Sequence, residues 1–144
     1  MTSIFEKTYR QVQEAKKEFE IATDEAGKEV ARKSYKAALK AIEDLGGKAI
    51  RIWSEYETSR NSGNEYLNID QVVWDKDVEE LISCMRENGI ERFTFSSGWT
   101  DAVETAWLFQ KAGCVLEGLV EINKCNLTPF TDECEKIHGY LFRV

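Results

Sequence analysis

The hydrophobic positions of the first sixty residues recur every three or four residues, which is the period of an amphipathic helix. A first helix is predicted over residues 3–22, where Ser3 and Glu6 have the spacing of a capping box. A second helical pattern starts at Asp24 and keeps its phase to about Arg60. Its hydrophobic positions are Ala31, Tyr35, Ala38, Ile42, Leu45, Ala49, Ile52 and Tyr56. The first sixty residues therefore predict a long antiparallel helical hairpin.

The second helical pattern contains the pair Gly46-Gly47, which leaves its continuity open. Two glycines together cost a helix about 2 kcal/mol, so a break is possible there. Because the phase is retained, we expect one continuous helix of roughly 55 Å, at about 1.5 Å per residue. A rival interpretation makes Lys48–Tyr56 a strand, since its hydrophobic residues also alternate.

The pattern changes to shorter segments after the turn at residues 61–64, which is the best domain boundary. We therefore divide the chain into a helical hairpin at 1–60 and an α+β domain at 64–144. Residues 66–73 predict a short strand or an extended segment, and a helix follows that begins at Asp75 or Asp77 and ends at Asn88-Gly89. Its core positions are Val78, Leu81, Ile82 and Met85.

Residues 90–123 read as strand, helix, strand, and the rest of the domain is organised around them. Phe93 and Phe95 alternate with polar residues, as in a half-buried strand. Thr100 or Asp101 can cap the helix, whose core face is predicted to hold Ala102, Val103, Ala106 and Phe109. The next strand is predicted to have one apolar side, which consists of Cys114, Leu116, Gly118, Val120 and Ile122.

A polar loop over residues 124–136 and a last strand over residues 137–144 complete the predicted domain. The last strand is expected to pair antiparallel with residues 115–122. The fold class is therefore α+β, with a long helical hairpin followed by a sheet of three or four strands and two helices.

The charge of the 144-residue chain is uneven along its length. Residues 1–60 carry 12 Lys and Arg and 11 Asp and Glu, whereas residues 61–144 carry 7 and 15. This acidic half argues against nonspecific nucleic-acid binding, which needs cations to neutralise phosphates. Two alternatives are left: a solvated acidic surface, or a surface that faces a basic partner.

Two properties of the chain predict a cytoplasmic protein. No apolar run approaches the roughly 18 residues that a membrane helix needs. The first twenty residues are too charged for a secretory signal. Four reduced cysteines are the expectation in that compartment.

The side chains that carry chemistry give weak signals, and we predict neither a metal nor another cofactor. Cys125, Cys134 and His138 resemble a metal half-site, but their spacing matches no common zinc pattern and a second pair is lacking. Cys114 or Cys134 with His138 would make a thiol dyad, yet no flanking cation favours a thiolate. Residues 96–98 form a tight capped turn rather than a phosphate loop. No catalytic residue is predicted.

The acidic and aromatic residues offer a choice between binding and structural roles. Glu117 and Glu121 are predicted on one side of a strand, either as an acid pair or as its solvent face. Of the four tryptophans, Trp99 and Trp107 are candidates to anchor a partner. The alternative is that the N-terminal hairpin covers Trp107.

Residues 74–144 contain the segment FTFSSGWTDAVETAWLFQKAGC and the end EKIHGYLFRV. This part of the chain resembles a family of small uncharacterised bacterial proteins associated with phages and mobile elements. Small acidic proteins of that origin look like anti-CRISPR inhibitors. The resemblance implies a non-catalytic protein that binds a Cas nuclease or its ribonucleoprotein complex.

The first functional hypothesis is therefore an inhibitor whose acidic groups block a basic nucleic-acid channel. We expect no membrane contact and no direct binding to nucleic acid. The predicted partner-binding residues are Asp70, Asp75, Asp77, Glu79, Glu80, Trp99, Trp107, Glu117 and Glu121. The alternative is a structural or regulatory module that dimerises through its N-terminal helices. A third hypothesis is an enzyme that uses a cysteine or His138.

Overall fold

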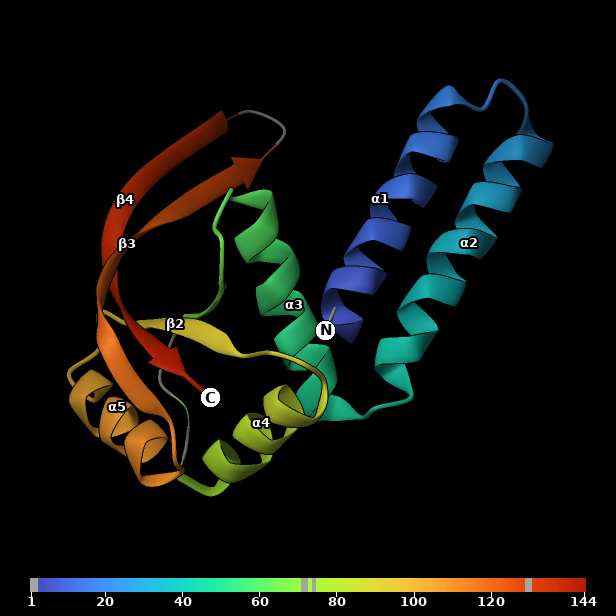
Figure 1. Cartoon of the computed structure of the whole chain (residues 1–144). Coiled ribbons are helices and arrows are strands. Elements are labelled where there is room, and N and C mark those ends of the chain that lie inside the picture. Colours follow the sequence, from blue (N-terminus) through green and yellow to red (C-terminus); the bar gives the residue numbers. More distant parts are fainter. Residues whose placement is uncertain (1–2, 71–72, 74, 129–130) are drawn as a thin grey trace.

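The computed structural model describes residues 3–70, 73, 75–128 and 131–144. This part of the chain forms five helices and one four-stranded sheet, so the fold is α+β as predicted (Figure 1). The helices are α1 (Ile4–Ile21), α2 (Glu25–Glu43), α3 (Gly47–Asn61), α4 (Asp75–Glu87) and α5 (Ala102–Lys111). The strands are β1 (Leu67–Asp70), β2 (Arg92–Ser96), β3 (Val115–Thr128) and β4 (Thr131–Arg143).

Helices α1 and α2 form the predicted hairpin, which projects from the rest of the molecule (Figure 1). The Ser3 side chain caps α1 by accepting a hydrogen bond of 3.0 Å from the Glu6 N–H, as its spacing predicts. Phe5 and Val12 are fully buried on the inner side of α1. The hairpin is attached at its base, where the Phe5 ring lies 6.1 Å from the ring of Tyr56 on α3.

The predicted continuous helix over residues 24–60 is wrong, because α2 ends at Glu43 and α3 begins at Gly47. Gly46 has a φ of 101°, in the region that favours glycine, and this conformation separates the two helices. The rival strand over Lys48–Tyr56 is also wrong, since this segment is helical throughout. The glycine pair thus outweighs the retained hydrophobic phase.

Helix α3 covers the outer edge of β1, which is an edge strand of the sheet. The Ser59 hydroxyl accepts a hydrogen bond of 2.9 Å from the Asn68 N–H. One helical turn earlier, the Glu55 carboxylate accepts a hydrogen bond from the backbone of Asp70. Glu55 and Ser59, four residues apart on α3, thus bond to the backbone of Asp70 and Asn68, which are two residues apart on β1. The side chains of α3 satisfy backbone groups that an uncovered edge would offer to another strand.

The sheet has the order β1-β2-β4-β3, with β1 and β2 parallel and the other neighbouring pairs antiparallel. The parallel pair is joined through α4, whose predicted core positions Val78, Leu81, Ile82 and Met85 are all buried. The Phe109 ring of α5 lies 5.1–5.5 Å from the rings of Phe93, Phe95 and Phe142. This aromatic cluster fixes α5 on one face of the sheet.

Strand β2 is more buried than the predicted half-buried strand, because Thr94 and Ser96 are also inside the protein. Asn68 of β1 satisfies both hydroxyls: its side-chain oxygen accepts a hydrogen bond of 2.8 Å from Thr94, and its side-chain nitrogen donates one of 3.1 Å to Ser96. The polar residues Thr94 and Ser96 therefore form buried hydrogen bonds rather than a face of the sheet that is exposed to solvent.

The predicted polar loop over residues 124–136 is wrong within the described residues, since β3 continues to Thr128 and β4 starts at Thr131. The predicted pairing of the last strand with residues 115–122 is confirmed as the first part of this long hairpin. The far part of the hairpin reaches the loop that precedes β1. There the N–H and C=O groups of Asn123 bond to the Asn64 side chain, each at 2.8 Å.

Candidate protein-binding face

Large apolar side chains are exposed on and just before α5. The exposed fractions are 69% for Trp99, 71% for Val103 and 52% for Trp107. The predicted core face of α5 is wrong for Val103, because the fully buried positions of this helix are Thr105 and Phe109. Asp101 occupies the N-cap position, but its side chain makes no capping hydrogen bond. Because Trp107 is exposed, the alternative in which the N-terminal hairpin covers it is wrong. The Lys111 ammonium lies 5.1 Å from the centroid of the Trp107 ring.

Strand β3, which follows α5 after a short turn, also carries exposed apolar side chains. Its side chains Leu116 and Leu119 are exposed by 40% and 65%. A β-bulge lies between Leu116 and Gly118, so the extra residue Glu117 shifts the alternation of the strand. Leu116 is opposite Phe142 and Leu119 opposite Tyr140, which places both leucines on the face of the sheet that α5 covers. The single apolar side predicted for this strand is therefore wrong.

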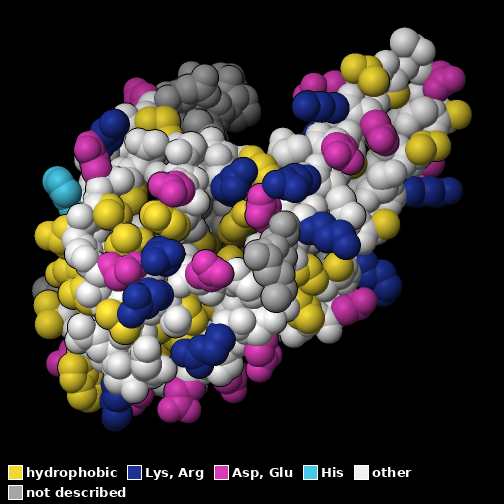
Figure 2. Space-filling view, viewed as in Figure 1, with side chains coloured by type: hydrophobic (Ala, Val, Ile, Leu, Met, Phe, Trp, Pro, Cys, Tyr) yellow, Lys and Arg dark blue, Asp and Glu magenta, His cyan; other side chains and the backbone are white. Residues whose placement is uncertain are grey.

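We call Trp99, Val103, Trp107, Leu116 and Leu119 the α5–β3 apolar face. Figure 2 shows hydrophobic side chains gathered over the region of α5 and β3, at the left of the view. Large side chains of this kind are costly to leave in water unless something covers them.

The bulge also separates the two carboxylates that were predicted on one side of β3. The Glu117 carboxylate accepts a hydrogen bond of 2.7 Å from Nε of Arg92 and lies 3.9 Å from Arg143. This hydrogen bond raises the pKa of Arg92. Glu121 is opposite His138 and lies 4.0 Å from Lys136. Glu117 is therefore the centre of an ion-pair group that fixes the bulge, and the two residues do not form an acid pair.

The remaining predicted acidic residues are spread over several elements. Asp77 is paired with Lys48 of α3 at 2.7 Å, and this hydrogen bond lowers the pKa of Asp77. Asp70 lies at the end of β1 beside Glu55. The other three, Asp75, Glu79 and Glu80, are exposed on α4. The structure brings together only the carboxylates of α4, whereas Trp99 lies just before α5 and Trp107 lies on it.

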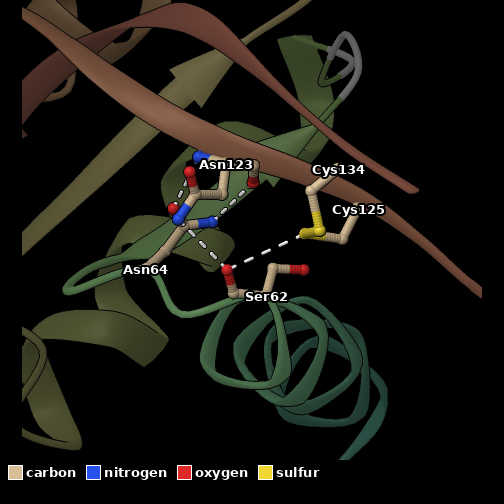
Figure 3. Close-up of a disulfide and its surroundings, with 5 residues drawn as sticks. All are labelled: Ser62, Asn64, Asn123, Cys125 and Cys134. Atoms are coloured by element: carbon tan, nitrogen blue, oxygen red, sulfur yellow. Dashed lines mark hydrogen bonds between the residues drawn. A yellow bond between two sulfur atoms is a disulfide. The ribbon is translucent and has the colours of Figure 1, made fainter. Parts of the chain in front are cut away.

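The cysteines and the histidine are not assembled into a reactive group in the described part of the chain. Cys125 and Cys134 face each other across the β3–β4 hairpin and form a disulfide, so the predicted reduced state is wrong for this pair (Figure 3). Cys84 and Cys114 are free. Burial raises the pKa of Cys114 to about 11, which keeps its thiol protonated at neutral pH. His138 is exposed and is four residues from Cys134 along one strand.

Metal ligation and membrane insertion find no support among the described residues. These residues contain no group of three or more His, Cys, Asp or Glu that could hold a metal ion. Nor does any described helix combine the length and apolar character that are needed to cross a membrane. Trp74, the remaining tryptophan of the domain, lies outside the described residues.

The loop before β1 bonds to the far part of the β3–β4 hairpin, a contact that no sequence pattern predicted (Figure 3). The Asn123 side chain donates a hydrogen bond of 3.2 Å to the Ser62 carbonyl, in addition to its backbone bonds with Asn64. Next to this contact, Sγ of Cys125 lies 3.9 Å from the same carbonyl. Asparagines in a predicted turn and a predicted strand carry no signal for a contact across 59 residues.

The fold and the exposed face define a small α+β domain with a helical hairpin at its N-terminal side. A family model matches residues 51–144, and the chain belongs to this family, which is described as a domain of unknown function (DUF7698). The match starts within α3 and leaves out α1 and α2. No curated protein and no solved structure matches the chain.

Proposed function

We propose that this chain is a non-catalytic protein-binding module and that the α5–β3 apolar face is its contact surface. The observation that carries the proposal is the exposure of Trp99 and Trp107 on and before α5, together with the exposed leucines of the following strand β3. Tryptophan is enriched among the residues that dominate binding energy at interfaces. This surface lies within the region that matches the family model, residues 51–144.

The state of the reactive side chains supports a non-catalytic role. A thiol nucleophile needs a thiolate, whereas Cys114 is buried and has a raised pKa. Cys125 and Cys134 are bonded to each other, and His138 is exposed on β4, where it is opposite Glu121. Binding without chemistry is the role that agrees with these three arrangements.

Site-specific photo-crosslinking tests the proposed surface in cells. A photo-crosslinking residue is placed at Trp107 or at Ile21, which is also apolar and exposed but lies on the hairpin. Adducts specific to position 107 are identified by mass spectrometry, and the purified partner is titrated by calorimetry. We expect Trp107→Glu to weaken binding at least about tenfold, that is about 1.4 kcal/mol, and Ile21→Glu to leave it unchanged. Equal adducts at both positions, or binding that Trp107→Glu leaves intact, would contradict the proposal.

Inhibition of a bacterial immune nuclease is the narrower form of this proposal. The exposed carboxylates Asp75, Glu79 and Glu80 share α4 and support an approach to a basic channel. A DNA-cleavage assay with a Cas nuclease tests it. Inhibition by the wild type should be lost in the triple Lys variant of these residues and weakened by added salt. A nuclease that cleaves equally with and without the protein removes this form and leaves the general one.

Dimerisation through the N-terminal helices is the second candidate. A groove between α1 and α2 is lined by Ala15, Phe19, Ala31 and Tyr35 and by the charged residues Lys16, Glu20, Arg32 and Lys36. The nearby Val30 is exposed. Light scattering over a range of concentrations separates the candidates. A dimer that Phe19→Glu dissociates and Trp107→Glu does not would favour the hairpin as the contact surface.

A further inference from the structure

The two edges of the sheet differ in how much of their backbone is bonded to other parts of the chain. At one edge, Ser59 and Glu55 of α3 bond to the backbone of β1. At the other edge, the side chain of Asn64 bonds to β3 only at Asn123. The sheet therefore has one covered edge and one edge that is occupied at a single residue within the described part of the chain.

The direction of the free backbone groups of β3 follows from Asn123. Both its N–H and its C=O point away from β4, because both bond to Asn64. The pairing of β3 with β4 is regular from Leu119 to Asn123, and in an antiparallel pair every second residue points the same way. Leu119 and Glu121 therefore also direct their N–H and C=O groups outward. Among the described residues, no segment pairs with these four groups.

The devices that usually block an edge are missing from this part of β3. Natural edge strands carry lysine, proline or an inward charge, or they are short. Residues 115–123 contain neither lysine nor proline. The bulge at Glu117 lies before the free groups at Leu119 and Glu121, and the charge of Glu121 disfavours an acidic segment without excluding a basic one. Leu119 also has an exposed apolar side chain, next to these free backbone groups.

We propose that the edge of β3 at Leu119–Glu121 binds an extended segment of a partner protein, which adds to the sheet as a further strand. The proposal rests on the proposed protein-binding function and specifies its mode. Backbone hydrogen bonds give affinity in this mode, and alternate side chains give specificity. The segment would lie beside Leu119 and next to the α5–β3 apolar face.

The charges of the edge define the chemistry of this segment. Leu119 and Glu121 are on the same face of β3, two residues apart. A neighbouring strand then favours an aliphatic side chain beside Leu119 and a cation beside Glu121. A second copy of the chain is a poorer occupant, because residues 115–123 of its own edge contain no lysine or arginine to place beside Glu121. The partner segment is therefore one in which basic and aliphatic residues alternate on one face.

The probe is the octapeptide Lys-Thr-Val-Thr-Lys-Thr-Val-Thr, with a control that has Glu in place of Lys. Two further versions carry N-methyl groups on alternate amides, one in each phase. The full chain is titrated with each peptide and followed by amide NMR. We expect shifts centred on Leu119 and Glu121 and at least tenfold weaker binding of the Glu control. Binding should be lost for one phase of N-methylation and kept for the other, because only every second amide faces β3.

Substitutions at Leu119 test the same contact from the side of the protein. Leu119→Pro removes an outward N–H without removing a hydrogen bond to β4, and Leu119→Thr keeps the N–H as a matched control. We expect the proline variant to lose peptide binding and the threonine variant to keep it. If the proline variant does not fold, the N-methylated peptides give the same information on the wild-type chain.

Three results would overturn strand addition. They are equal binding of both N-methylated peptides, no amide shift up to millimolar peptide, and a concentration-dependent dimer in which the Leu119 amide is protected from exchange. The last result identifies a second copy as the occupant. None of them removes crosslinks at Trp107, so failure of strand addition remains distinguishable from failure of the proposed function.

Discussion

At the residue scale, the most informative side chain is Glu55, a carboxylate that bonds to the edge of β1 from a partly buried position. Burial raises the pKa of Glu55 above its ordinary value of 4.5, and the nearby Asp70 carboxylate adds to this effect. The hydrogen bond from the Asp70 backbone acts in the opposite direction and lowers it. The net result is a group that folding makes easier to protonate.

The raised pKa fixes how stability depends on pH at this site. A carboxyl group whose folded pKa is raised contributes stability below the unfolded pKa, and this contribution is lost as pH rises through the folded pKa. Glu55→Gln keeps an oxygen acceptor and removes the charge. We therefore expect a higher free energy of unfolding than wild type at pH 7, and a smaller difference at pH 4.

Urea denaturation at the two pH values measures this difference. Glu79→Gln is the control, since Glu79 is exposed on α4. A Glu55→Gln variant that is less stable than wild type at pH 7 would show that the Asp70 contact requires the ionised carboxylate.

At the element scale, most helices and strands are predictable from the sequence, because their signals are local. Ser3 and Glu6 mark the start of α1, and the hydrophobic positions of α4 mark its buried face. The bulge at Glu117 has no local signal, since it is fixed by Arg92 and Arg143 from other strands. For this reason the exposed leucines of the candidate site could not be predicted, whereas Trp99 and Trp107 could be selected as candidates.

The break between α2 and α3 yields a prediction with a matched pair of glycines. Gly46 has a φ of 101°, whereas Gly47 is the first residue of α3, and neither has an atom that a Cβ would meet within 4 Å. Gly46→Ala should therefore lower the free energy of unfolding by about 1–3 kcal/mol through backbone strain. Gly47→Ala should be neutral or stabilising by up to about 1 kcal/mol. Thermal and urea denaturation of both variants provide the measurement, and equal effects would mean that α2 and α3 join in another conformation.

At the scale of the whole molecule, the hairpin is anchored at its base and extends into solvent at its far end (Figure 1). Two phenylalanines of α1 report on these regions: Phe5 is fully buried against Tyr56, and Phe19 is 39% exposed beside Lys28 and Arg32. Phe5→Ala should lower the free energy of unfolding by about 3–5 kcal/mol. Phe19→Ala should cost no more than about 1 kcal/mol, the size of an exposed cation–π contact.

Urea denaturation followed by circular dichroism tests the pair. A large effect of Phe19→Ala would mean that the far end of the hairpin is covered in solution, as the dimer candidate requires. A small effect of Phe5→Ala would mean that the hairpin is not attached to α3 through this contact.

Because α3 occupies the β1 side of the sheet, the two edges of the sheet differ in their ability to accept a further strand. A sheet that is open on both sides can propagate from molecule to molecule into a fibre. Here a strand can add only on the β3 side, because side chains of α3 already bond to the backbone of β1 on the other side. The chain therefore cannot propagate with itself through both edges of its sheet, and two copies that paired through β3 would present a covered β1 edge at each end.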